Sequence, residues 1–173
     1  MFVLALACCG MPLQSATLER LSFSDMVLKS SAVVRGTVVS SSAAFTGSLI
    51  YTHYKVQVTE SLKGHRSGLI DVAVPGGVAG GVRQPVAGAP EFQPGDDYVF
   101  FLWTSNTGIT QVIGLTQGMF RVTGSGADPA VARAPSLELM LDPHTHKPVK
   151  DQELDMKLSQ LRSAIANLLG TGQ

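Results

Sequence analysis

The sequence predicts a mainly β fold: a small antiparallel β-barrel, closed or partly open, with a short helix before it and an amphipathic helix after it. Apolar and polar side chains alternate along residues 50–62, as in a strand with one buried face. Residues 97–103 are apolar on both faces, which is typical of a central strand. Apolar residues recur at intervals of three and four near the end of the chain, which indicates a helix. A two-sheet sandwich is the alternative architecture.

Length and charge place the chain among ordinary globular domains. It has 173 residues, of which 45% are hydrophobic, and its 13 Lys and Arg balance its 13 Asp and Glu. This composition excludes a disordered chain, which would be poor in apolar residues and strongly charged. It also argues against a nucleic-acid-binding protein, because no surplus of positive charge is present to displace counterions from phosphates.

Residues 1–16 have the composition of a secretory signal peptide. They carry no charge, begin with an apolar stretch of about a dozen residues and end in Gln14-Ser15-Ala16. We therefore expect export to the periplasm or beyond the cell, with cleavage after Ala16. Both cysteines, Cys8 and Cys9, lie within this segment. A lipid anchor on Cys8 is the alternative, and a mature chain without cysteine would have no thiol chemistry or disulfides.

The first part of the remaining chain is predicted to contain a helix and three strands. Gly36 interrupts a β-branched run and predicts a bulge or a bend. The alternating segment is too long for a small flat sheet, since 13 residues at about 3.3 Å each span roughly 43 Å. A bent strand is therefore expected. The predicted elements are a helix at 18–31, strands at 32–40, 50–62 and 69–74, and loops at 41–48 and 75–93.

The second part is predicted to add strands and to end in the helix. Leu154, Leu158, Leu161, Ile165 and Leu168 define the apolar face of that helix, with Asp151 as its N-terminal cap and Gly170 at its end. The predicted strands are 97–103, 109–115, 118–123 and 137–141. The domain organisation that follows is a leader at 1–16, a barrel at 17–123, a linker at 124–136, and a C-terminal strand and helix at 137–173 that pack on the barrel.

The order of these segments resembles the netrin-like domain of tissue inhibitors of metalloproteinases, an OB-type β-barrel. The resemblance covers about residues 24–123 and rests on apolar strand runs of moderate specificity; the segments are 31–38, 54–58, 62–64 and 94–102. Segments 88–92 and 114–122 look more like a group of exported bacterial proteins of unassigned function. Inhibition in the netrin-like family uses an N-terminal cysteine on the zinc of the protease, and no residue of a chain that starts near Thr17 matches it.

The glycine-rich loop after the third strand is the candidate binding site. It lacks the Gly-Lys-Ser/Thr ending of a phosphate loop, and it is apolar and weakly charged. Such a loop can dock a protein partner, because exposed apolar patches often mark interaction sites. The predicted binding residues are Gly76, Gly77, Gly81, Arg83 and Phe92. The sequence thus predicts an exported, non-catalytic module that binds a protein or another macromolecule of the cell envelope.

Catalytic patterns are weak in this sequence. His144 and His146 are the only close histidine pair and would be the ligands of a metal-dependent hydrolase, the alternative function, but Pro143 and Pro148 favour an exposed turn. Asp96 and Asp97 are adjacent and are expected to point apart. We expect no cofactor, no resident metal, no nucleic-acid partner and no transmembrane span. An envelope lipoprotein with a structural role is a further alternative.

Overall fold

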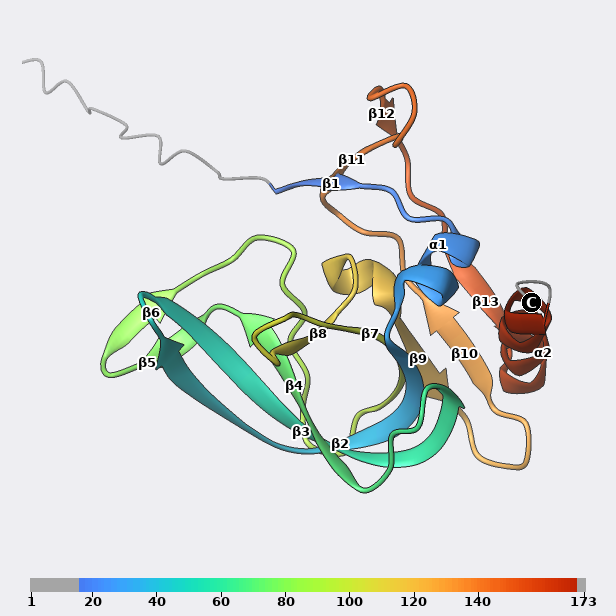
Figure 1. Cartoon of the computed structure of the whole chain (residues 1–173), viewed down its shortest axis with the longest axis horizontal. Coiled ribbons are helices and arrows are strands. Elements are labelled where there is room, and N and C mark those ends of the chain that lie inside the picture. The colour runs from blue at the N-terminus through green and yellow to red at the C-terminus, as the bar shows by residue number, and fades with distance from the viewer. Residues whose placement is uncertain (1–15, 171–173) are drawn as a thin grey trace, which may run out of the picture.

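A computed structural model of the chain describes residues 16–170 (Figure 1). The protein is mainly β with two helices, and antiparallel pairing dominates, which confirms the predicted class. The largest sheet has eight strands in the order β13-β10-β9-β7-β2-β3-β4, with β8 beside β7. Its strands are β2 (Ala32–Thr46), β3 (Leu49–Lys63), β4 (Leu69–Pro75), β7 (Asp97–Thr104), β8 (Thr110–Val112), β9 (Met119–Thr123), β10 (Ala130–Arg133) and β13 (Leu154–Lys157).

The long strands β2 and β3 bend this sheet. The pairing of β2 with β3 shifts register at three places. One of these shifts lies between Arg35 and Gly36, where a bulge or a bend was predicted. A side chain at Gly36 would come within 2.8 Å of the Gln57 carbonyl oxygen. The bend brings β4 into contact with β8. Within residues 16–170 no hydrogen-bonded pairing joins these two strands, so a closed barrel is not found.

Two apolar cores lie on opposite faces of the sheet. Alternate residues of β2 and β7 serve each of them, so that Phe100 lies in the first core and Phe101 in the second, both fully buried. The first core lies among β2, β3, β4 and β7, and the second lies between the sheet and the helices α1 (Phe23–Lys29) and α2 (Leu158–Gly170). The prediction that β7 is central, with both faces apolar, is confirmed.

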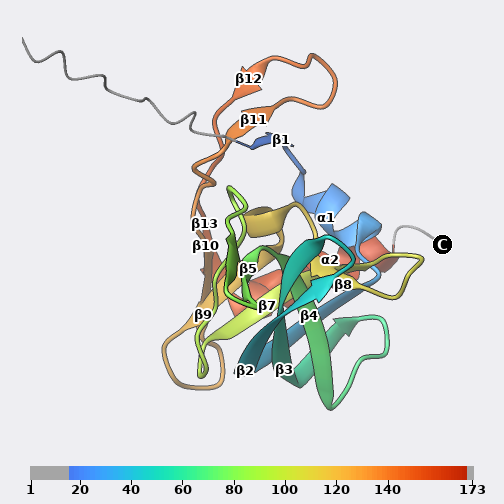
Figure 2. The same cartoon turned by 90° about the vertical axis from the view of Figure 1, so that its left-hand side faces the viewer.

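Two small sheets complete the described structure. The hairpin β5 (Gly77–Ala79) and β6 (Val82–Gln84) stands beside the far end of β2 and β3 (Figure 1). The strands β1 (Thr17–Glu19), β11 (Leu139–Leu141) and β12 (Pro148–Val149) form an arm that projects from the main body (Figure 2). A 3₁₀ helix, η1 (Leu115–Gly118), precedes β9.

The N-terminal half differs from the prediction in three places. The predicted helix at 18–31 is shorter, because the Ser22 and Asp25 capping box starts α1 at Phe23 and residues 17–19 pair with β11 instead. The predicted loop at 41–48 is wrong: β2 continues to Thr46, paired with β3 as far as Leu49. The predicted loop at 75–93 contains the β5–β6 hairpin.

The C-terminal half differs in three further places. The predicted strand at 109–115 is confined to β8 and is followed by η1. The predicted linker at 124–136 contains β10, which pairs with β9 and β13 within the main sheet. The helix begins later than predicted, since residues 154–157 form β13, and Asp151 is not its cap. The Asp128 carboxylate accepts hydrogen bonds from the Ser159 amide and hydroxyl at 2.7 and 2.8 Å instead.

Candidate functional site

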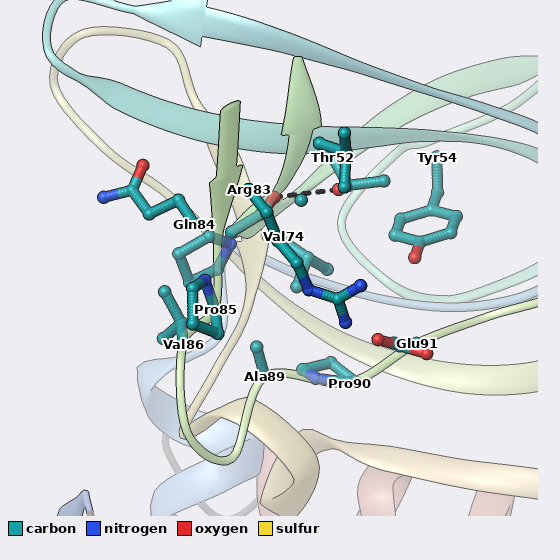
Figure 3. Close-up of a pocket in the computed structure, with 14 residues that line it drawn as sticks. Thr52, Tyr54, Val74, Arg83, Gln84, Pro85, Val86, Ala89, Pro90 and Glu91 are labelled. Atoms are coloured by element: carbon teal, nitrogen blue, oxygen red, sulfur yellow. Dashed lines mark hydrogen bonds between the residues drawn. The ribbon is translucent and has the colours of Figure 1, made fainter. Parts of the chain in front are cut away.

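A pocket of about 390 Å³ lies between the β5–β6 hairpin, the ends of β3 and β4, and the loop 85–91 (Figure 3). Three of the five predicted binding residues, Gly76, Gly77 and Arg83, line it. The walls combine apolar residues, among them three prolines, with a few polar groups. The lining side chains that Figure 3 labels are Thr52, Tyr54, Val74, Arg83, Gln84, Pro85, Val86, Ala89, Pro90 and Glu91.

Two adjacent glycines turn the chain from β4 into the hairpin. Gly76 and Gly77 have φ angles of +98° and +132°, which side chains disfavour. The Gly76 amide donates to the Ile50 carbonyl at 2.8 Å, and the Gly76 carbonyl accepts from the Thr52 hydroxyl at 2.8 Å. A side chain at Gly77 would overlap the Thr52 hydroxyl oxygen. These glycines therefore shape the back of the pocket by bringing two backbone segments close together.

Gln84 fixes the other strand of the hairpin to the main sheet. Its side-chain oxygen accepts a hydrogen bond of 2.6 Å from the Ile50 amide. The hairpin is thus held at both ends by Ile50, whose carbonyl binds Gly76 and whose amide binds Gln84. This anchoring gives the pocket a defined wall on the side of the hairpin.

Arg83 and Glu91 bring opposite charges to the mouth of the pocket. Both are exposed, and Figure 3 shows the guanidinium and the carboxylate on the same side of the cavity. Neither belongs to an ion pair within the part of the chain that the structure describes. Both groups are therefore accessible to a ligand or partner of complementary charge.

Tyr54 supplies a neutral hydroxyl at the floor of this pocket. Burial raises the pKa of Tyr54, the Phe92 backbone amide opposes this rise, and the negative charge of Glu91 adds to it. The phenol is therefore protonated at neutral pH and can donate a hydrogen bond. A nucleophile would need the opposite shift, so Tyr54 supports binding rather than covalent chemistry.

The other two predicted residues lie away from this surface. Gly81 is at the tip of the β5–β6 hairpin, with open space where a side chain would be. Phe92 is only 2% exposed and lies in the first core. Its ring packs edge-on against Tyr54, Tyr98 and Phe100 at centroid distances of 4.9, 5.3 and 5.4 Å. Phe92 thus supports the floor of the pocket from behind.

An exposed apolar surface beside the pocket was not among the predicted site residues. We define the hairpin patch as Phe45, Leu49, Val78 and Val82, each about half exposed. The β2–β3 and β5–β6 hairpins lie together here, since a side chain at Gly80 would be 3.4 Å from the Phe45 ring. Residues 41–48 were predicted to be a loop, which concealed the proximity of Phe45 and Leu49 to this site.

The histidines and paired acids show no assembled catalytic group. His144 and His146 lie in an exposed turn, in which the Asp142 side chain accepts from the His144 and Thr145 amides at 3.0 and 2.8 Å. Across residues 16–170, no three His, Cys, Asp or Glu side chains are placed to hold a metal ion. Asp96 and Asp97 bind Arg121 and Arg35 respectively, so they point apart as expected.

Comparisons with known proteins identify no relative of this chain. No family model, no curated protein and no solved structure matches the chain. Within the described residues, neither helix is both long and apolar enough to cross a membrane. The pocket and the hairpin patch are therefore the features of this chain from which a function can be inferred.

Proposed function

We propose that this protein is an exported, non-catalytic module that binds a protein or another macromolecule of the cell envelope. The contact surface is the pocket together with the hairpin patch. The bent sheet is a partly open, OB-like framework that presents this surface at one end. The leader at residues 1–16 would direct the chain to the periplasm or beyond the cell.

The hairpin patch carries this proposal. Val78 and Val82 are 57% and 51% exposed on a hairpin that is anchored to the main sheet through Ile50. Exposed apolar groups on rigid elements lose little conformational entropy on binding, which favours recognition. The charges of Arg83 and Glu91 at the pocket mouth would orient a partner and help to select it.

Export is supported by how the described chain is stabilised. Both cysteines lie within residues 1–16, so the mature chain would be free of thiols that an oxidising compartment could cross-link. Two buried cores stabilise the fold without disulfides. Among residues 16–170, no third His, Cys, Asp or Glu side chain joins His144 and His146 in a group that could hold a metal ion, so the hydrolase alternative has no support there. The leader and the alternative lipid anchor at Cys8 lie outside the described residues.

Site-specific photo-crosslinking in cells tests the proposed contact surface. A photoreactive residue at Val78 is expected to give a discrete crosslinked product in the envelope fraction. The matched control is Leu69, which is 56% exposed but is not part of the hairpin patch. The same product from both positions, or from neither, would contradict the proposal. The double variant Val78→Ser/Val82→Ser should abolish a product formed from a second crosslinking position at Phe45.

The proposed location is tested on protein purified from the native host. Intact mass and N-terminal sequencing should give a chain that begins at Thr17 in the periplasmic or secreted fraction. A chain that retains Met1 in the cytosol would refute export. A chain that begins at Cys8 and has the added mass of a diacylglyceryl group would support the alternative, a protein anchored to the membrane by lipid.

A further inference from the structure

The outer strand of the β5–β6 hairpin is an open sheet edge. β5 contacts β2 and β3, whereas β6 is paired with β5 alone within the part of the chain that the structure describes. Figure 1 shows the hairpin at one end of the molecule. An open edge presents unpaired N–H and C=O groups, on which a strand of another chain can pair.

The pairing of the hairpin shows which backbone groups of β6 face outward. Residues 80–81 form a two-residue turn with positive φ at both positions, so Ala79 and Val82 are the hydrogen-bonded pair that closes it. Hydrogen-bonded and non-bonded pairs alternate along an antiparallel ladder, so the N–H and C=O of Arg83 point away from β5. Within residues 16–170 neither of these two groups has a hydrogen-bond partner.

The side chains of β6 define the segment that fits this edge. Arg83 is exposed and has no ion pair among the described residues, so an acidic side chain directly opposite it would be favoured. Val82 is 51% exposed and points to the other face of the hairpin, because side chains alternate along a strand. The residue next to the acid would lie opposite Val82, and an apolar side chain there would cover it.

We propose that β6 binds an extended segment of a partner protein as an added strand, with an acidic residue opposite Arg83 and an apolar residue opposite Val82. This inference rests on the proposed function, because it specifies how the partner engages the hairpin. Hydrogen bonds to the Arg83 backbone fix the register of the segment, and the two side chains select it. A partner that docks a helix or a flat apolar surface makes no use of the Arg83 N–H.

Glu91 limits the charge of the segment. Figure 3 shows its carboxylate on the same side of the pocket as the Arg83 guanidinium. The negative charge of Glu91 opposes that of an incoming acid, so a segment with one acid fits better than a segment with several. Glu91→Gln removes this repulsion and should strengthen the binding of an acidic segment.

Hydrogen exchange of the free protein tests the open edge itself. The Val82 amide donates within the hairpin, whereas the Arg83 amide faces outward. In the ¹⁵N-labelled mature chain, the Arg83 amide should therefore exchange with solvent faster than the Val82 amide. Equal protection of the two amides would refute the open edge.

The binding test is an NMR titration of the full mature chain with the peptide acetyl-Thr-Val-Glu-Val-Thr-amide. The matched control carries an N-methyl group on the Glu residue, so it lacks the N–H that would pair with the Arg83 carbonyl. The first peptide should bind in a saturable manner and slow the exchange of the Arg83 amide, and the N-methylated peptide should do neither. Equal binding of both peptides, or binding of neither, would overturn the proposed strand addition.

Two variants separate the backbone of Arg83 from its charge. Arg83→Pro removes the outward N–H and leaves the hydrogen bonds between β5 and β6 in place, so it should abolish peptide binding. Arg83→Gln keeps the N–H and should weaken binding about threefold, the effect of one cross-strand charge pair. Arg66→Gln, on an exposed turn, should bind the peptide like the unmodified protein. If Arg83→Pro does not fold, the N-methylated peptide and the exchange of the Arg83 amide decide the outcome.

Crosslinking at Val78 in cells distinguishes a failure of this inference from a failure of the proposed function. A crosslinked product that Arg83→Pro abolishes supports strand addition. A product that Arg83→Pro retains would refute strand addition and leave the proposed contact surface intact. The absence of any product from the natural chain would refute both.

Discussion

Alanine at Gly77 should destabilise the protein much more than alanine at Gly81, although both glycines belong to the same hairpin and have positive φ. Gly77 has φ +132° and Gly81 has φ +77°. A side chain at Gly81 meets no atom within 4 Å. At Gly77 it would overlap the Thr52 hydroxyl and would lie 3.2 Å from the Ala43 side chain. Both sites therefore have a positive φ that side chains disfavour, and Gly77 in addition lacks the space for a side chain.

The expected magnitudes follow from these contacts. Gly81→Ala should cost about 1–2 kcal/mol, the strain of placing an L-residue at positive φ. Gly77→Ala adds overpacking of about 1–3 kcal/mol. It also disturbs the hydrogen bond from the Thr52 hydroxyl to the Gly76 carbonyl, worth about 1 kcal/mol. The loss of backbone freedom in the unfolded chain is common to both substitutions and cancels in the comparison.

Urea unfolding gives the free energy of unfolding of each variant, compared with that of the natural chain at a common m-value. Thr52→Ala provides an internal test, because it removes the hydroxyl that the new side chain would overlap. Gly77→Ala should then cost about 1 kcal/mol less in the Thr52→Ala background than alone. Equal costs at Gly77 and Gly81, or no coupling between Gly77 and Thr52, would refute the assignment of Gly77 as a close backbone approach.

Two further predictions concern residues that join distant segments. Gln117 is 1% exposed; its side chain accepts a hydrogen bond from the Leu21 amide at 2.8 Å and donates one to the Glu19 carbonyl at 3.0 Å. Gln117→Leu should therefore lower the free energy of unfolding by about 2–4 kcal/mol and remove the hydrogen-exchange protection of the Leu21 amide. A Leu21 amide that stays protected in this variant would contradict the prediction. The hydrogen bonds from Ser159 lower the pKa of Asp128 below its ordinary value of 3.8. The Asp128 carboxylate therefore stabilises the folded protein above pH 3.8, and this contribution is lost as the pH falls and the carboxylate is protonated. The stability difference between the natural chain and Asp128→Ala should therefore shrink in urea titrations from pH 6 to pH 2.5, and a constant difference would refute it.

The long elements could be predicted because their patterns are local. The alternation in β3 and the two apolar faces of β7 follow from which side chains are buried, and both strands are long enough to show the pattern. The start of α2 was misplaced because Leu154 fits the spacing of the helix as well as the inward face of β13. The local sequence cannot decide whether such a residue belongs to the strand or to the helix.

The short strands could not be predicted because distant partners create them. β1 pairs with β11 at a separation of more than 120 residues, and β10 exists as the link between β9 and β13. Three or four residues carry too little periodicity to indicate a strand before the partner is known. The ion pair of Asp151 with Arg133 has the same origin, since it joins residues that β10 and the segment before β13 bring together.

The composition of the glycine-rich loop predicted only part of the candidate site. Gly76, Gly77 and Arg83 line the pocket because a turn with positive φ places the hairpin beside the ends of β3 and β4. Phe92 follows the same loop but enters the first core, where rings from β3 and β7 surround it. The residue types in a loop therefore indicate that a surface is apolar, but they do not show which side chains face outward.

This difference decides which substitutions can report on function. Gly76, Gly77 and Phe92 are constrained by close packing, so their substitution changes stability and binding together. Val78 and Val82 are half exposed, and replacement by serine should change the free energy of unfolding by no more than about 0.5 kcal/mol. A loss of crosslinking in Val78→Ser/Val82→Ser, at unchanged stability, therefore reflects a contact with the partner, because the fold does not depend on these two side chains.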